Sequence, residues 1–264
     1  MSRFDLKARV VAHGQVGPQI YILGLRAPEI TRAVRPGQFC MLDPKPPGAH
    51  DPLLRRPFSV HRVGPKGLLV FMYKIVGRGT AIMSRLVPGD ILKVLGPLGN
   101  GFSIDRDRPG LLVAGGIGIA PMVYLAESWP QGLSQAVVLG GRTDKELRYG
   151  IRCLEDTSAK VFVATEDGSL GERGLVTGLL PEALSFLKKD PVIYACGPWP
   201  MLRAVAVFAE EKGLLCQVSL EAHMACGLGL CLGCTIKSNS GKYLHVCMDG
   251  PVFSKDQIDW DAPL

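Results

Sequence analysis

The sequence is poor in the features that mark membrane, secreted and nucleic-acid-binding proteins. Over 264 residues, charged side chains make up 20% and aromatic side chains 7%. The first ten residues include Arg3, Asp5, Lys7 and Arg9, so the apolar core of a secretory signal is not expected there. The longest uncharged stretch, residues 109–126, holds four glycines and two prolines. It predicts a buried strand, loop and helix instead of a membrane span.

The charge is spread thinly along the chain. The formal net charge is +6, and no run of Lys or Arg is interleaved with aromatic residues. We therefore expect neither a nucleic-acid nor a membrane partner. These features predict a cytoplasmic protein, and in a reducing compartment cysteines are more often ligands than disulfides.

Four of the eight cysteines fall within 22 residues, spaced C-x4-C-x2-C with the fourth after twelve further residues. This is the spacing of the plant-type loop that holds a [2Fe–2S] cluster. Glycines in the loop permit close backbone approach and leave N–H groups free to point at the sulfurs. The candidate ligands are Cys226, Cys231, Cys234 and Cys247, and the loop glycines are Gly227, Gly229 and Gly233.

Zinc, disulfides and free thiols each fit these four cysteines less well. A structural zinc site also takes four thiolates, but usually as two closely spaced pairs, whereas this loop has one such pair and one x4 step. Disulfides are disfavoured because nothing indicates secretion. Buried free thiols account for Cys40, Cys153 and Cys216, but not for four thiols in so short a segment.

The chain divides into three parts by pattern. Short apolar runs punctuated by Gly and Pro predict an antiparallel β-barrel over residues 1–102, interrupted by a helix near 79–86. Strands alternating with helices predict a doubly wound parallel sheet over residues 103–220. A small cluster-bearing extension follows over residues 221–264. The expected strands are 7–12, 19–25, 38–42, 58–62, 68–75, 91–95, 111–114, 136–139, 160–164 and 192–195, and the expected helices of the second part are 120–128, 174–184 and 201–212.

Two strand–loop–helix junctions in the second part suit a dinucleotide. Gly116, Gly118 and Pro121 form a G-x-G-x-x-P turn, in which glycines admit a pyrophosphate and the following helix offers N–H donors. Cys196-Gly197-Pro198 ends another strand, where Cys196 is placed to meet a nicotinamide ring. A tight turn without ligand, or a packed thiol, explains each junction when it is taken alone.

A third group of residues lies in the predicted barrel. Arg56 offers a bidentate donor for phosphate, Phe58 an aromatic face, and Ser59 a hydroxyl for a ring nitrogen. Gly79 and Thr80 open the expected helix, which is a natural seat for phosphate. Alone, Arg-Pro-Phe-Ser is more often a plain entry into a strand.

The order of these motifs resembles the ferredoxin–NADP reductase superfamily over roughly residues 1–220. With the cysteine loop attached, the whole chain is similar to the electron-transfer subunits of NAD-dependent, two-component dihydroorotate dehydrogenases. The resemblance implies an FAD-binding barrel, NAD(H) as an exchangeable substrate and a [2Fe–2S] cluster on the four cysteines. It implies catalytic roles for Ser59 and Cys196 and places Glu221 and His223 near cluster and flavin. A solvated position at a strand end explains Glu221 and His223 at least as well. The implied FAD contacts are Arg56, Pro57, Phe58, Ser59, Tyr73, Lys74, Ile75, Gly79 and Thr80, and the implied nucleotide contacts are Gly116, Gly118, Pro121, Cys196, Gly197 and Pro198.

The implied function is electron transfer from a dihydroorotate-oxidising FMN subunit to NAD⁺ in pyrimidine biosynthesis, within a heterotetramer. The small subunits of bifurcating NADH-dependent ferredoxin:NADP oxidoreductases, and of sulfhydrogenases, share this layout. The bifurcating family usually has aspartate as first cluster ligand, where this chain has Cys226. A zinc-bound redox sensor or scaffold is the non-enzymatic alternative, and colour would distinguish it.

Nucleotide preference is less clear from the residues. The second strand of the sheet ends at Leu139-Gly-Gly-Arg142 without an acidic residue to hold a ribose hydroxyl. Arg142 is suited to a 2′-phosphate instead. Thr165, Glu166 and Asp167 end the next strand, where they either face the nucleotide or form a surface turn.

Overall fold

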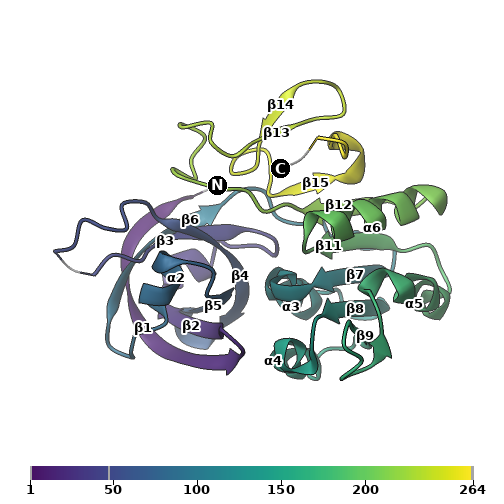
Figure 1. Ribbon diagram of the computed structural model, residues 1–264, viewed down its shortest axis with the longest axis horizontal. Coiled ribbons are helices and arrows are strands. Elements are labelled where there is room, and N and C mark those ends of the chain that lie inside the picture. Colours follow the sequence, from purple (N-terminus) through teal and green to yellow (C-terminus); the bar gives the residue numbers. More distant parts are fainter. Residues whose placement is uncertain (1, 47, 263–264) are drawn as a thin grey trace.

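A closed barrel, a seven-stranded sheet flanked by helices and a small extension follow one another along the chain (Figure 1). This is a computed structural model, and it describes residues 2–46 and 48–262. No helix in these ranges is long and apolar enough to span a bilayer.

The barrel closes in the strand order β1-β2-β5-β4-β3-β6, with every pair antiparallel. Alternate residues of these strands point inward, and Leu23, Leu25, Val60 and Phe71 are fully buried inside. All six strands expected from the sequence are present. Their bounds are β1 (Phe4–Gly17), β2 (Ile20–Arg26), β3 (Phe39–Asp43), β4 (Arg56–Gly64), β5 (Leu68–Lys74) and β6 (Ile91–Leu98), with short helices α1 (Pro28–Thr31) and α2 (Arg78–Met83).

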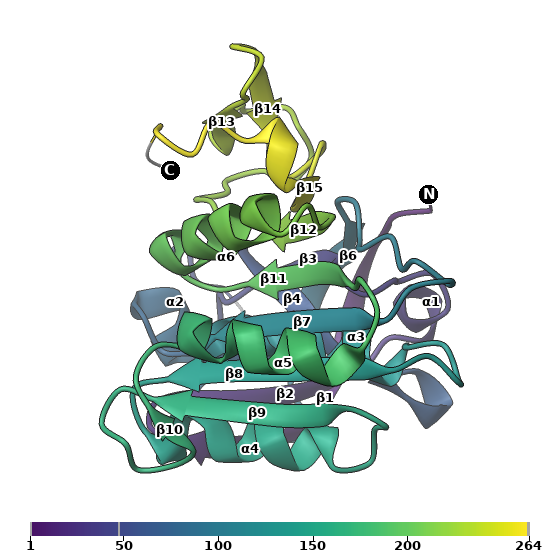
Figure 2. The same cartoon turned by 90° about the vertical axis from the view of Figure 1, so that its right-hand side faces the viewer.

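The sheet has the order β10-β9-β8-β7-β11-β12-β15, parallel except for β15. Its central strands are buried, apart from Gly141 at the end of β8, because helices cover both faces. Helices α3 and α4 lie on the face toward the barrel, and α5 and α6 on the opposite face (Figures 1 and 2). The bounds are β7 (Gly110–Gly115), α3 (Ile119–Glu127), β8 (Gln135–Gly141), α4 (Asp144–Leu154), β9 (Lys160–Thr165), β10 (Glu172–Arg173), α5 (Leu180–Leu187), β11 (Val192–Cys196), α6 (Trp199–Glu211) and β12 (Cys216–Ser219).

The structure corrects three expectations about these elements. The helix expected over 174–184 is divided into a 3-10 helix, η3 (Val176–Leu179), and α5, because Pro181 favours the first turn of a new helix. Helix α2 ends at Met83, before the expected end at residue 86. Helix α4 and the short strand β12 were not expected from the sequence.

The C-terminal extension is also more ordered than its weak periodicity indicates. It contains the hairpin strands β13 (Thr235–Lys237) and β14 (Tyr243–His245), then β15 (Val252–Ser254) and the 3-10 helix η4 (Lys255–Gln257). Strand β15 pairs antiparallel with β12, so the extension completes the nucleotide-side sheet. The Asn100 amide donates to the carbonyls of Met248 and Asp249, each at 3.0 Å, which ties the extension to the barrel side as well.

Candidate functional site

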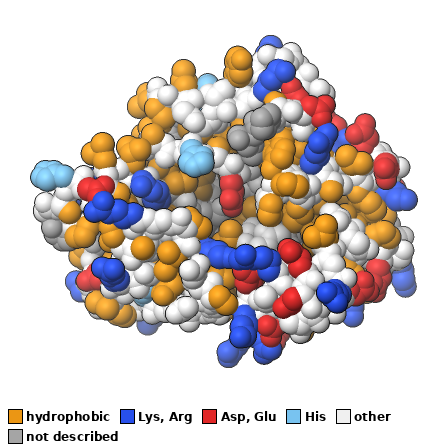
Figure 3. Space-filling model, viewed as in Figure 1, with side chains coloured by type: hydrophobic (Ala, Val, Ile, Leu, Met, Phe, Trp, Pro, Cys, Tyr) orange, Lys and Arg blue, Asp and Glu red, His pale blue; other side chains and the backbone are white. Residues whose placement is uncertain are grey.

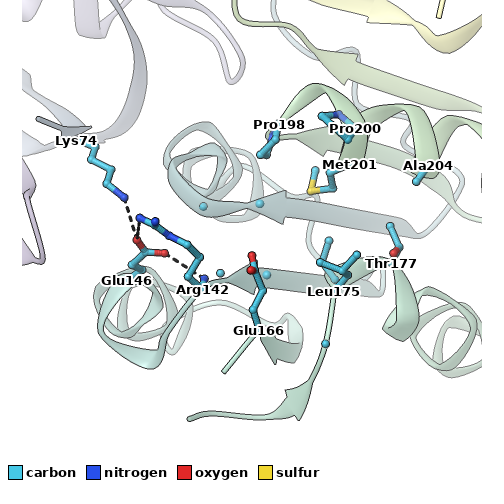
Figure 4. Close-up of a pocket in the computed structure, with 16 residues that line it drawn as sticks. Lys74, Arg142, Glu146, Glu166, Leu175, Thr177, Pro198, Pro200, Met201 and Ala204 are labelled. Carbon is cyan, nitrogen blue, oxygen red and sulfur yellow. Dashed lines mark hydrogen bonds and ion pairs between the residues drawn. The ribbon is translucent and has the colours of Figure 1, made fainter. Parts of the chain in front are cut away.

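A cavity of about 420 Å³ opens at the carboxyl ends of the parallel strands (Figure 4). Glycines form much of its wall, which leaves backbone exposed for a ligand to approach. This is the edge where open α/β sheets bind nucleotides. Its lining comprises Lys74, Gly115, Gly116, Gly140, Gly141, Arg142, Glu146, Glu166, Gly174, Leu175, Val176, Thr177, Pro198, Pro200, Met201 and Ala204.

Two of the six residues expected to contact the nucleotide, Gly116 and Pro198, line this cavity. Gly118 instead lies against the end of β11, where a Cβ atom would come 2.2 Å from the carbonyl oxygen of Cys196. Pro121 is buried within α3. Gly197 borders the lining residue Met201, since its Cβ would lie 2.7 Å from the methionine methyl carbon. Gly118, Pro121, Cys196 and Gly197 are thus not part of the cavity lining.

Cys196, the last residue of β11, lies close to Glu221, which follows β12. The Cys196 thiol is buried, and desolvation together with the nearby Glu221 carboxylate raises its pKa. Glu221 is solvent accessible, yet enough protein surrounds it that desolvation raises its pKa too. This combination is typical of a carboxylate in a crevice. His223, the other residue expected near the cluster and the flavin, is exposed.

An ion-pair network lines one side of the cavity and joins the barrel to the sheet (Figure 4). The Glu146 carboxylate on α4 accepts hydrogen bonds from Lys74 Nζ at 2.9 Å and Arg142 Nη2 at 3.0 Å. It also accepts from the Arg142 backbone N–H at 3.2 Å. Desolvation opposes ionisation of Glu146, but these donors outweigh it, so its pKa is lowered. The flavin contact expected of Lys74 stays a prediction, and in the structure its side chain pairs with Glu146.

The barrel brings together the residues suited to phosphate. Arg56 begins β4 and lies over the first turn of α2, since a Cβ on Gly79 would come 3.3 Å from Arg56 Nε. The Thr80 hydroxyl accepts from the backbone N–H groups of Val76 and Gly77, at 3.0 and 3.2 Å, and donates to the Gly77 carbonyl. Thr80 therefore shapes the loop before α2. A guanidinium beside the N–H groups of a helix start fits a phosphate pair.

Aromatic side chains form the neighbouring surface of the barrel. Phe58 meets Tyr73 edge to face, with ring centroids 5.7 Å apart. The Tyr73 hydroxyl hydrogen-bonds His13 Nε2 at 2.9 Å. Ser59 follows Phe58 on β4 and is half-buried, while Ile75 is held through its N–H, which donates to Gln19. In the view of Figure 3 the surface is hollowed between the barrel and the sheet, below the extension.

The four cysteines of the extension converge with free thiols. Among the described residues, no three His, Cys, Asp or Glu side chains are arranged to hold a single metal ion. Instead the cysteines lie as two neighbouring pairs: Cys231 is beside Cys226, and the Cys247 N–H donates to Cys234 Sγ at 3.4 Å. Two pairs of thiols fit a cluster of two irons better than one tetrahedral zinc ion.

Backbone N–H groups point at these sulfurs, as expected from the loop glycines. The N–H of Leu228 donates to Cys226 Sγ at 3.3 Å, and that of Gly229 to Cys247 Sγ at 3.2 Å. Burial opposes ionisation of Cys226, but N–H donors led by Leu228 outweigh it and lower its pKa to about 6. A thiolate is thereby favoured, and thiolate is the form that binds iron.

Three features of the site were missed at the sequence level. Gly140 and Gly141 line the cavity, and their place at the end of a predicted strand was the available signal. Residues 174–177, which lead into the first turn of η3, form part of the lining, which a helix over 174–184 does not indicate. The pairing of Lys74 with Glu146 joins residues 72 positions apart and has no signal in the sequence.

Comparison with known proteins agrees with this geometry. Residues 221–259 match the family model for the iron-sulfur cluster binding domain of dihydroorotate dehydrogenase B. A solved structure described as the NADH-dependent reduced ferredoxin-NADP oxidoreductase, studied for flavin-based electron bifurcation, superposes with a TM-score of 0.81. It is 31% identical, and the match covers 96% of this chain and 90% of that one. The ferredoxin reductase of carbazole 1,9a-dioxygenase, with 23% identity and a TM-score of 0.69, shares the fold.

Two relatives match over nearly their whole length. The dihydroorotate dehydrogenase B (NAD(+)) electron transfer subunit of Desulforamulus reducens is 38% identical, with 96% of this chain and 98% of the relative covered. The protein of the same name from Caldanaerobacter subterraneus subsp. tengcongensis is 36% identical, covering 97% and 99%. Identity at this level over full length shows common descent of the whole architecture. The chain belongs to the family of dihydroorotate dehydrogenase B (NAD(+)) electron transfer subunits.

Proposed function

We propose that this chain carries electrons between NAD(H) and a separate dihydroorotate-oxidising subunit, through FAD and a [2Fe–2S] cluster. One observation carries the proposal. Gly227, inside the cysteine loop, lies against Met41, since a Cβ there would come 2.7 Å from Met41 Cγ. Met41 on β3 pairs directly with Pro57 on β4, within the flavin motif. The cluster loop therefore rests on the strand next to the proposed flavin site, as direct electron transfer requires.

The residues present fit both groups. Arg56 and the loop of residues 77–80 would hold the FAD phosphates, with Phe58, Ser59 and Tyr73 along the ring system. When bound, FAD supplies the conversion between two-electron hydride chemistry and single electrons. Ser59 would orient the flavin ring through its hydroxyl. Cys196, as a buried, protonated thiol, would lie on the side where the nicotinamide ring binds. We assign the iron ligands to Cys226, Cys231, Cys234 and Cys247, and place the domain boundaries after residues 102 and 220.

The proposed partner approaches the cluster loop. Cys231 is exposed, and its neighbours Leu230 and Leu232 are 80% and 55% exposed. Apolar side chains around an accessible ligand suit a protein partner better than solvent. We propose that this partner contains FMN, that two copies of each subunit assemble as a heterotetramer, and that electrons flow from dihydroorotate to NAD⁺ in the cytoplasm.

The test is reconstitution of the two-subunit reaction. The chain, purified anaerobically with a dihydroorotate dehydrogenase catalytic subunit, is expected to support dihydroorotate-dependent NAD⁺ reduction that neither subunit supports alone. Cys231→Ser is expected to abolish this activity while NADH oxidation with ferricyanide persists, and Cys153→Ser, a buried thiol outside the loop, serves as the matched control. Full coupled turnover by Cys231→Ser would contradict the electron route.

A second candidate function rests on the 31% identical bifurcating oxidoreductase and its TM-score of 0.81. If the chain oxidises NADH with artificial acceptors but neither binds nor activates the dihydroorotate-oxidising subunit, the assignment moves to that class.

A further inference from the structure

The charged residues of the nucleotide cavity balance one another. Lys74, Arg142, Glu146 and Glu166 are the charged members of its lining, two of each sign. Lys74 and Arg142 both donate to the Glu146 carboxylate, whose side chain is only 9% exposed. Both cations are therefore already paired with a carboxylate, and with Glu166 counted the four side chains carry no net charge before a ligand enters.

The Glu166 carboxylate is available to a ligand, whereas that of Glu146 is not. Glu166 follows the end of β9, and its side chain projects into the cavity between Arg142 and Leu175 (Figure 4). Within the described part of the chain its carboxylate has no hydrogen bond or ion pair, although its charge acts on Arg142. It is thus available as an acceptor for a donor on the ligand.

The position of these residues decides what part of a dinucleotide they meet. In this class of sheet the pyrophosphate sits at the first strand–helix turn, here Gly116, and the adenosine ribose at the end of the next strand, here Gly140–Arg142. A ribose 2′-hydroxyl is a hydrogen-bond donor, whereas a 2′-phosphate is a dianionic acceptor that requires an unpaired cation.

We propose that Glu146 and Glu166 make this cavity selective for a nicotinamide dinucleotide with a free 2′-hydroxyl. Glu146 holds Arg142 away from a 2′-phosphate, and Glu166 accepts from the ribose diol and repels a 2′-phosphate. The acidic residue usual at the end of the second strand is thereby replaced by one at the end of the third. The inference rests on the proposed function, because it assigns selectivity to that function's nucleotide site.

The experiment compares NAD⁺ and NADP⁺ binding to the FAD-loaded protein by isothermal titration calorimetry, together with ferricyanide-linked oxidation of NADH and NADPH. The variants are Glu146→Gln, Glu166→Gln and Arg142→Ala combined with Glu146→Gln. Glu210→Gln, an exposed glutamate on α6 away from the cavity, is the control.

The wild-type protein is expected to prefer NAD⁺, and each single glutamate variant to shift the ratio of dissociation constants toward NADP⁺ by about tenfold, the scale of one hydrogen bond to a charged group. Adding Arg142→Ala is expected to cancel the gain made by Glu146→Gln. If NAD⁺ binds but both single variants leave the ratio within about twofold of wild type, the selectivity is overturned and the proposed function stands. If the protein binds neither nucleotide, both are overturned.

Discussion

The contact between the cysteine loop and the barrel predicts a large effect of Gly227→Ala. Gly227 has φ +70°, where an alanine costs about 1–2 kcal/mol. Its Cβ would also meet Met41 Cγ at 2.7 Å and Sδ at 3.0 Å, and Met41 is fully buried. Overpacking of such a site adds about 1–3 kcal/mol. The variant is therefore expected to lose about 2–5 kcal/mol of unfolding free energy.

Gly241→Ala provides the matched control within the same extension. Gly241 has φ +79°, but no heavy atom lies within 4 Å of the position of its Cβ. It carries the backbone cost of about 1–2 kcal/mol without the packing cost. Only Gly227→Ala should displace the adjacent Cys226 and lower the iron and acid-labile sulfide content per chain.

The assays are urea unfolding followed by circular dichroism, and iron and sulfide analysis after anaerobic purification. Met41→Ala in the Gly227→Ala background removes the clashing atoms and is expected to recover cluster content. Equal destabilisation by Gly227→Ala and Gly241→Ala, within about 0.5 kcal/mol and with full iron content in both, would refute the contact between loop and barrel as the cause.

Three further predictions concern the barrel, its interface and the cluster. Burial lowers the pKa of His61 to about 4 against an ordinary 6.5, so its contribution to stability is complete above pH 6.5 and is lost as the pH falls toward 4. That loss is roughly 3 kcal/mol of unfolding free energy. His61→Asn keeps a donor for the Ala120 carbonyl and should flatten the pH dependence of the unfolding free energy measured in urea. An unchanged pH dependence would contradict this. Ser59→Ala should slow FAD reduction by NADH in stopped-flow experiments by about 10- to 100-fold at unchanged FAD content, and loss of FAD instead would indicate a binding role. Cys231→Ser should remove the visible bands of the cluster but retain flavin absorbance, whereas retention of iron would exclude Cys231 as a ligand.

The features predicted best from the sequence are those set by local chemistry. The spacing of the cluster cysteines follows from the shape of the loop that must enclose the cluster, so it is readable without a fold. The barrel strands were predicted because short apolar runs separated by Gly and Pro indicate which residues are buried locally. The Gly116 turn was recognised for the same reason.

The missed features depend on the tertiary structure or on weak patterns. Helix α4 begins with a run of charged residues, although Leu147, Gly150 and Leu154 mark a buried face at helical spacing. Strand β15 has three residues and exists because β12 offers it an edge. The pairing of Lys74 with Glu146 could not be read from the sequence, since these residues meet only when barrel and sheet come together.

The pairing of β15 with β12 has a consequence for how this protein can be divided. Without residues 252–254, β12 would be an open edge strand with unpaired N–H and C=O groups, which is a template for aggregation. The extension therefore covers the open edge of the nucleotide-side sheet, besides carrying the cysteines. A reductase fragment cut after residue 220 is expected to self-associate, and the short β15 segment is the part that a soluble minimal fragment must retain.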